Sequence, residues 1–405
     1  MKPTRTVSRL EEIIAALPQG YHQLKRILLT NFHPQQGGGG GHARYIQTLL
    51  RSDLRKEFEF AVAAPEGSAV WTQAPALGAR AFACDFPGHF REIPQMAGAV
   101  RRFHRIASEW RPDLVHANGS RDQNIVLLWK ALHRDPTPCV RTHHAVRNIP
   151  DNLYNRWAYR KMIAGHLYVS HSAKNISWAG PYLKPPNSMV VSNGVDTDFW
   201  SPRPKDPASL RDLGLAPTDF VFGSHAGMGA HKRTDLFLRG AALYRQSGAA
   251  RAFKVLLRGN EEDVRRSKAL AAELGLDNVV YVGHTPDPRG YLSVIDVGFL
   301  LSEAIEAISF AARELMAMGK PLISSNYAGL VENVDDELNG RLVECGDADG
   351  VAQAIAWFLN LDAERFAEVS RNARLKAERV FGVKKQVQGL RRFYRASLGL
   401  STSSV

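Results

Sequence analysis

Cysteine is scarce in this 405-residue chain, and long apolar runs are absent. The three cysteines, Cys84, Cys139 and Cys345, show neither disulfide nor zinc-ligand spacing, which favours a reducing, cytosolic environment and gives no indication of a metal site. No apolar run reaches the roughly 20 residues of a transmembrane helix. The basic, polar N-terminus also lacks the apolar core of a signal peptide. These absences predict a cytoplasmic protein without a membrane span.

Acidic residues are fewer than basic ones, 40 against 52, which leaves a net charge of +12. Such an excess favours an anionic partner, such as a membrane surface, a nucleic acid or a phosphorylated substrate, although solubility alone is a sufficient explanation. The hydrophobic fraction of 44% and the charged fraction of 23% are typical of soluble globular proteins. A chain of this length is expected to form two domains.

Strand-like and helix-like segments alternate along the chain, which predicts parallel sheets with helices on both faces. In the first half, strands are expected near 25–30, 58–65, 79–84, 113–118, 139–144 and 188–194. A proline-rich stretch without periodicity follows, and then a second alternation begins. We therefore predict an α/β protein of two Rossmann-like, doubly wound domains facing a cleft. Its predicted parts are an extension (1–23), an N-terminal domain (24–193), a C-terminal domain (194–380), and a last helix and tail (381–405).

Five consecutive glycines, Gly37 to Gly41, separate the first predicted strand from a helix. A strand, a glycine turn and a helix allow backbone N–H groups to approach a phosphate or a sugar closely. The spacing differs from the dinucleotide-binding G-x-G-x-x-G pattern. Without other information, a flexible loop explains the run equally well.

Two glutamates mark a predicted strand-to-helix corner in the second half. The apolar run 294–301 predicts a buried strand, and helical spacing predicts a helix from about Ala307 to Met318. Glu306 then lies at the turn and Glu314 two helical turns later. Corners at the carboxyl ends of parallel strands commonly bind ligands. The alternative is that Glu306 only caps the helix and that Glu314 is a solvated surface charge.

Two histidines, His116 and His144, fall at the carboxyl ends of predicted strands. A single buried histidine is usually structural, but two at equivalent strand ends favour a shared cleft. Asp196 and Asp198 form a D-x-D pattern that binds a metal–nucleotide in another fold. Here the pattern lies in the stretch between the predicted domains, so we interpret it as structural.

Several segments, in this order, resemble signatures of the retaining, two-Rossmann-domain (GT-B) glycosyltransferases of family 4. The resemblance covers about residues 25 to 380. Its segments are the glycine loop, HAN (116–118), THH (142–144), VSNGVDTDFWSP (191–202), Glu306 with ELMAMGKP (314–321), Glu332 and NGRLVECGD (339–347). It implies metal-independent transfer of a sugar from a UDP- or GDP-linked donor, with no cofactor, because the nucleotide-diphosphate sugar is itself a substrate.

The resemblance also implies two sets of site residues. The catalytic set is Glu306, Lys232 and His144, and the donor-binding set is Gly40, Gly41, Arg233, Ser309 and Glu314. Lys232 would offset charge on the leaving diphosphate. Glu306 and His144 would contact the donor sugar, and Glu314 would accept hydrogen bonds from the ribose hydroxyls. Gly40 and Gly41 would approach the diphosphate through backbone N–H groups.

Two positions depart from the family pattern. Gly227 stands where the family has an arginine, five positions before the lysine, and Arg233 is a candidate substitute that points differently. Ser309 stands where the family has a glycine, which affects donor choice or activity. These departures leave a catalytically weakened nucleotide-sugar-binding protein as one alternative, and a nucleotide-sugar 2-epimerase of the same fold as another.

The resemblance implies a saccharide or lipid-linked acceptor, as in lipopolysaccharide or cell-surface polysaccharide synthesis. Basic aromatic segments at 101–105 and 154–161 favour peripheral contact with an anionic membrane, at its inner face. Packing of Trp157 and Tyr159 in the core is the alternative for the second segment. Beyond its net charge, the sequence has no motif that supports nucleic-acid binding.

Overall fold

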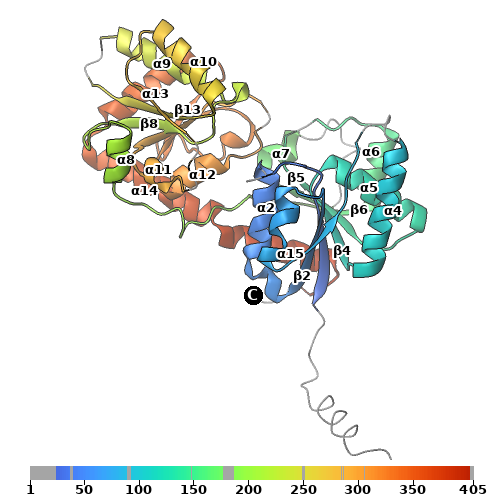
Figure 1. Ribbon diagram of the computed structural model, residues 1–405. Coiled ribbons are helices and arrows are strands. Elements are labelled where there is room, and N and C mark those ends of the chain that lie inside the picture. Colours follow the sequence, from blue (N-terminus) through green and yellow to red (C-terminus); the bar gives the residue numbers. More distant parts are fainter. Residues whose placement is uncertain are drawn as a thin grey trace, which may run out of the picture.

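The computed structural model describes residues 24–36, 40–88, 93–146, 148–176, 187–248, 251–283, 285, 287–304 and 306–401. It consists of two α/β domains joined at their base by the long C-terminal helices (Figure 1). The predicted extension 1–23, three glycines of the loop (37–39) and the last four residues of the tail lie outside the described residues.

The N-terminal domain contains a parallel sheet of seven strands in the order β3-β2-β1-β4-β5-β6-β7. Its strands are β1 (Lys25–Thr30), β2 (Phe58–Ala64), β3 (Arg80–Ala83), β4 (Leu114–Ala117), β5 (Cys139–His143), β6 (Ile163–Tyr168) and β7 (Ser188–Val190). The strand order reverses direction between β1 and β4, so the carboxyl ends of these two strands border a crevice.

The C-terminal domain contains a parallel sheet of six strands in the order β10-β9-β8-β11-β12-β13. Its strands are β8 (Val221–Ser224), β9 (Lys254–Arg258), β10 (Val279–Val282), β11 (Val297–Leu300), β12 (Leu322–Ser325) and β13 (Gly340–Val343). The order reverses between β8 and β11, which again opens a crevice at their carboxyl ends. Both sheets confirm the predicted doubly wound architecture.

Helices cover both faces of each sheet (Figure 1). In the N-terminal domain they are α2 (Gly40–Arg51), α3 (Ala69–Gln73), α4 (Ile93–Trp110), α5 (Ser120–His133), α6 (Leu153–Trp157) and α7 (His171–Ile176). Successive residues of β1 point to opposite faces. Ile27 and Leu29 therefore pack in a core with α2 and α3, whereas Leu28 packs in another core with α4 and α5.

The C-terminal domain is built in the same way. Its helices are α8 (Pro207–Asp212), α9 (Thr234–Gln246), α10 (Glu261–Glu273), α11 (Arg289–Ser293), α12 (Phe310–Ala317), α13 (Ala348–Asn360) and α14 (Ala363–Phe381). Helices α9 and α13 pack on one face of the sheet, and α12 and α14 on the other. Helix α14 is absent from the elements predicted above.

The last helix, α15 (Val383–Ser397), returns to the N-terminal domain, where Phe393 and Tyr394 join its core. The chain thus crosses between the domains twice. The two crossings are adjacent, because Val195 forms a β-bridge with Gly382. The N–H of Gly194 also donates a 2.8 Å hydrogen bond to Oε1 of Gln386. This pairing makes the base of the cleft a two-strand hinge.

Helix α12 is shorter than predicted: it begins at Phe310 rather than near Ala307. The hydroxyl of Ser309 accepts a hydrogen bond from the N–H of Ala312, 3.3 Å away, and so caps the helix. The predicted stop is confirmed, since Gly319 has a φ of +75°, the left-handed conformation that ends helices. The late start leaves Glu306 in a loop after β11.

Candidate active site

Lys232 and Glu306 form an ion pair on the C-terminal side of the cleft. Lys232 ends a short 3₁₀ helix (Ala230–Lys232) after β8, and Glu306 follows β11. Because β8 and β11 are neighbours in the sheet, the loops at their carboxyl ends meet. The hydroxyl of Ser302 lies 3.5 Å from Oε1 of Glu306, whose residue is only 9% exposed. The structure therefore brings together two side chains that the sequence predicted for one site.

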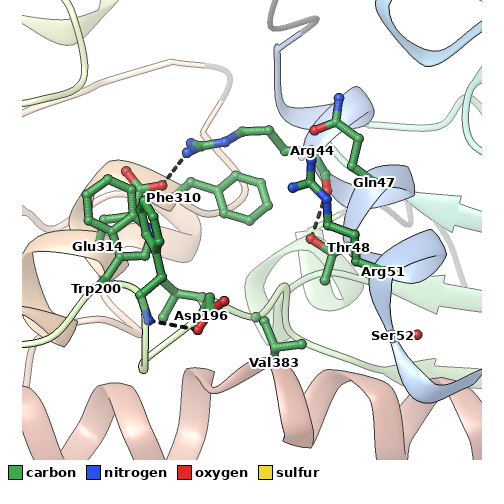
Figure 2. A pocket seen from close by; sticks show the side chains of 13 residues that line it. Arg44, Gln47, Thr48, Arg51, Ser52, Asp196, Trp200, Phe310, Glu314 and Val383 are labelled. Atoms are coloured by element: carbon green, nitrogen blue, oxygen red, sulfur yellow. Dashed lines mark hydrogen bonds and ion pairs between the residues drawn. The ribbon is translucent and has the colours of Figure 1, made fainter. Parts of the chain in front are cut away.

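Glu314, in α12, is a buried carboxylate rather than a solvated surface charge: it is 2% exposed. One carboxylate oxygen is paired with the guanidinium of Arg44, which extends from α2 of the other domain (Figure 2). The other oxygen lies 3.1 Å from Nε2 of His225, at ion-pair distance but without hydrogen-bond alignment. The side chain of Phe310 lies beside this group, and Arg44, Phe310 and Glu314 line a cavity of about 370 Å³.

His144 follows β5 on the N-terminal side of the cleft. Its ring packs against those of His42 and Tyr45, with centroids 4.2 Å and 4.7 Å away. Burial, followed by the charges of neighbouring histidines and Arg141, lowers the pKa of His144 well below its usual value. The imidazole is therefore neutral at pH 7, and contributes hydrogen bonds rather than positive charge.

The neighbours of His144 also determine its tautomer. The amide nitrogen of Asn118 donates to the carbonyl oxygens of Thr30 and His116, 3.1 Å and 3.3 Å away. Its Oδ1 therefore faces Nε2 of His144, at 3.2 Å. Since an amide oxygen only accepts, Nε2 carries the proton and Nδ1 is the basic nitrogen. Asn118, which is anchored to backbone oxygens of β1 and β4, thus holds the ring of His144 in one tautomer.

His116 does not line the cleft, so the expectation that both histidines share it is wrong for this residue. It is fully buried within β4. Its Nδ1 lies 2.7 Å from the hydroxyl of Tyr394, and its Nε2 lies 2.6 Å from that of Thr142. Burial lowers the pKa of His116 to about 3. The side chain links β4 and β5 to α15, which is a structural role.

The described glycines of the loop, Gly40 and Gly41, form the N-terminus of α2. Gly40 has a φ of +69°, a backbone conformation that residues other than glycine rarely adopt. A Cβ on Gly41 would lie 4.0 Å from the ring of Phe310, so the helix start is close to the opposite domain. Free N–H groups at a helix start favour anions. This geometry suits the diphosphate contact implied for the two glycines.

Arg233 is held by two carboxylates. It forms ion pairs with Glu303 and with Asp235, whose Oδ1 is 3.1 Å from Nε. These hydrogen bonds, that of Asp235 first, raise its pKa. At Gly227, which has a φ of +77°, a Cβ would meet no atom within 4 Å. That Arg233 substitutes for an arginine at this place stays a prediction.

Ser309, a predicted site residue, and Asp196, of the D-x-D pattern, both hold nearby backbone N–H groups. The hydroxyl of Ser309 serves as the cap of α12 described above. Asp196 accepts hydrogen bonds through Oδ1 from the N–H groups of Asp198 and Phe199, at 3.1 Å and 3.0 Å. Asp196 thus stabilises a local turn, although it also lines the cavity beside Glu314, and the structural interpretation of the D-x-D pattern stays a prediction.

Sequence reasoning missed two residues that border the predicted side chains, Arg44 and His225, and it named Asn118 only as part of the HAN segment. A signal existed for Arg44, because it begins a polar face of α2 that includes Gln47, Thr48 and Arg51 in the cavity lining. Its partner Glu314 is 270 positions away, in the other domain. No local pattern predicts such a pair.

Comparison with known families gives two adjoining matches. The model for glycosyl transferases group 1 matches residues 206–376, which include Lys232, Glu306 and Glu314. The model for glycosyltransferase family 4 matches residues 39–199, which include His144. The chain belongs to the group 1 glycosyltransferases, family 4.

Among curated relatives, the putative colanic acid biosynthesis glycosyltransferase WcaL of Escherichia coli K12 is 32% identical over 218 residues. That match covers 50% of this chain and 51% of WcaL, so the chain spans about half the length of this relative. The D-inositol 3-phosphate glycosyltransferase of Segniliparus rotundus is 25% identical over 424 residues, covering 95% of this chain and 92% of that protein.

Solved structures with the same fold include a glycosyltransferase from Rickettsia africae, with a TM-score of 0.81 and 19% identity. The alignment covers 94% of this chain and 100% of that chain. Anabaena HepE, solved in complex with UDP, has a TM-score of 0.75 and 19% identity, with 92% and 100% covered. These likenesses confirm the two-domain GT-B fold. Within the described residues, no helix is both long and apolar enough to span a bilayer.

Proposed function

We propose that the protein is a retaining, metal-independent hexosyltransferase that uses a UDP- or GDP-linked sugar as donor. The observation that carries this proposal is a pair of buried carboxylates in the C-terminal domain, of which Glu306 is paired with Lys232 and Glu314 with Arg44 near the N-terminus of α2. These groups lie at the carboxyl ends of two facing parallel sheets, where such folds bind nucleotides. The solved HepE complexes with UDP and with UDP-glucose support a nucleotide-sugar donor.

In this proposal, the diphosphate lies between Lys232 and the N-terminus of α2. Negative charge grows on the diphosphate as the glycosidic bond breaks, and the ammonium of Lys232 offsets it. Glu306 holds that ammonium in place and contacts the donor sugar. The departing phosphate is suited to take the proton of the acceptor hydroxyl, which attacks the same face of the sugar and retains the anomeric configuration.

The proposed acceptor is a saccharide or lipid-linked saccharide of a cell-surface polysaccharide or lipopolysaccharide. The names of relatives support this class: they include a lipopolysaccharide core glycosyltransferase of Rhizobium meliloti, 34% identical over 100 residues, and WcaL. The N-terminal wall of the cleft would bind the acceptor, since the proposed donor groups are mostly on the C-terminal wall.

We also propose peripheral contact with an anionic membrane, through the N-terminal domain. Arg101 borders an apolar groove of about 510 Å³ between α4 and α5, where Leu132 is 70% exposed. Leu153 in α6 is 84% exposed. The aromatic part of the sequence prediction is wrong for Tyr159 and Phe103, which are buried in the core, so exposed arginine and leucine side chains carry this proposal.

Nucleotide release from UDP- and GDP-sugars, with and without a mixture of lipid-linked acceptors, tests the enzymatic proposal. A glycosyltransferase releases the nucleoside diphosphate faster with the correct acceptor and forms a glycoside. The anomeric configuration of that product tests retention. Formation of the 2-epimer of the donor sugar would instead indicate an epimerase. Absence of turnover and of nucleotide binding with every donor would contradict the proposal.

A further inference from the structure

The carboxylate of Glu314 is covered by Arg44. The Glu314 side chain is 2% exposed, although it faces a cavity, because the Arg44 guanidinium extends across the cleft and pairs with it (Figure 2). The Arg44 side chain itself is 41% exposed, and its Cζ lies 5.2 Å from the centroid of the Phe310 ring. A ligand hydroxyl that binds the paired carboxylate oxygen of Glu314 therefore has to compete with Arg44 for it.

Three cations at this cleft are already paired with carboxylates. Lys232 is paired with Glu306, Arg233 with Asp235 and Glu303, and Arg44 with Glu314. A nucleoside diphosphate brings at least two further negative charges into this partly buried place. Its binding beside these pairs favours an exchange of partners, because an uncompensated charge there is costly.

Arg44 is the best placed of these cations to make such an exchange. It follows Gly40 by four residues in α2, a distance of about 6 Å along the helix axis. It therefore lies one turn from the N–H groups that suit a diphosphate. Its planar guanidinium also matches two phosphate oxygens, as it matches a carboxylate.

We propose that Arg44 is a donor-binding residue that exchanges partners. When the donor binds, the Arg44 guanidinium moves from Glu314 to an oxygen of the diphosphate, and Glu314 accepts hydrogen bonds from the ribose hydroxyls instead. This inference rests on the proposed function, in which Glu314 binds the ribose. Arg44 belongs to the N-terminal domain and Glu314 to the C-terminal one. The exchange thus replaces a direct contact between the domains by one that passes through the donor.

If Arg44 only blocks Glu314, its removal should change ligand affinity in the opposite direction from that expected if it binds phosphate. If Arg44 only blocked Glu314, its removal would expose the carboxylate and tighten the binding of every ligand with a ribose. If Arg44 binds phosphate, its removal weakens diphosphate binding, and leaves the matching nucleoside unchanged or tighter. Titration calorimetry of wild type and Arg44→Ala with UDP, GDP, uridine and guanosine separates the two roles.

The expected result is a loss of about 10- to 100-fold in affinity for whichever diphosphate the wild type binds, as for a lost charge-assisted hydrogen bond. Arg44→Lys should recover part of it. Equal or tighter diphosphate binding by Arg44→Ala would overturn the inference. If the wild type binds none of these nucleotides, the proposed function itself fails, which is a distinct result.

Two further variants make the test specific. Arg239→Ala removes an arginine at an exposed position of α9 that does not line this cavity, and it should leave diphosphate affinity unchanged. In a Glu314→Gln background, the loss caused by Arg44→Ala should persist, because it arises at the phosphate. If the loss vanishes there, Arg44 acts through Glu314 alone and the inference is wrong. Equal thermal unfolding midpoints confirm that the variants are folded.

Discussion

Lys232 and Glu306, 74 positions apart in the sequence, form an ion pair across the loops that follow two neighbouring strands of the C-terminal sheet. The pair fixes the ammonium where the topology of the sheet places a ligand. It also gives each side chain a partner while no ligand is bound. A phosphate group that enters the site can compete with Glu306 for the ammonium, and the buried Glu306 carboxylate then needs a new partner, such as a hydroxyl of the donor sugar.

Lys232→Ala should lower turnover by roughly 100-fold or more, the scale reported for loss of one group that stabilises transition-state charge. The effect should fall mainly on turnover, because the charge on the leaving diphosphate grows as the bond breaks. Donor consumption under saturating conditions measures it. Arg239→Ala, at an exposed position of α9, is the control for loss of a cation. Turnover near that of the wild type would reject Lys232 as the phosphate-binding cation.

The N-terminal domain should lose stability as the pH is lowered. His116 and His166 have pKa values lowered to about 3 by burial, whereas the ordinary value is 6.5. Between these values the unfolded state binds more protons, so the free energy of unfolding falls as pH falls through this range. Each histidine contributes a loss of about 1.6 kcal/mol between pH 6.5 and pH 5.

Chemical denaturation between about pH 7 and pH 5 tests this effect. His116→Gln should be less stable at pH 7, because its contacts with Thr142 and Tyr394 are altered. Its stability should nevertheless fall less steeply with acid than that of the wild type, since one buried titrating group is gone. An unchanged slope in this variant would show that His116 is not the source of the acid sensitivity.

Much of the fold could be predicted from the sequence, because strands buried on both faces appear as apolar runs and glycines mark the turns. Helix α14 was missed for a physical reason. Two of its buried positions, Ala373 and Ala377, carry small side chains that hardly stand out in a helix otherwise rich in charge. Helix α12 was predicted too long because the capping hydroxyl of Ser309 is not visible as a break in apolar spacing.

The site residues that belong to sequence motifs were predicted. Those that are brought to the site only by tertiary packing were missed. Lys232, Glu306 and Glu314 lie in loops and helices whose place follows from the order of the strands. The Arg44–Glu314 pair depends on how the two domains face each other, which no local pattern encodes. His116 was misinterpreted because Tyr394, from a helix that returns from the far domain, occupies the space beside its ring.

Liposome binding should rise with the fraction of anionic lipid and weaken as salt is raised, because exposed charges are screened over about 10 Å at 0.1 M salt. Arg101→Glu combined with Leu132→Ser should reduce it, since these residues border and line the groove between α4 and α5. Arg239→Glu is the matched control, because it makes the same charge reversal on α9 of the C-terminal domain, away from the groove. Equal, salt-insensitive binding to neutral and anionic vesicles would count against membrane contact.

The two glutamates should differ in which kinetic constant they affect. Glu314 is expected to hold the ribose in both the ground state and the transition state, so its loss removes uniform binding. Glu314→Ala should therefore raise the Michaelis constant for the donor and weaken binding of the free nucleoside diphosphate. Glu306 is expected at the sugar, where positive charge develops as the bond breaks, so Glu306→Gln should depress turnover and leave that affinity nearly unchanged.

Calorimetry with the free nucleoside diphosphate tests this separation without knowledge of the acceptor. Glu364→Gln, at the exposed start of α14, is the control for loss of a carboxylate. The buried position of Glu314 makes folding a necessary check, because its removal leaves Arg44 without this partner. If folded variants of both glutamates bind nucleotide like the wild type and keep their turnover, Glu314 serves only to pair with Arg44 and Glu306 only to pair with Lys232. The donor site would then have to lie elsewhere in the cleft.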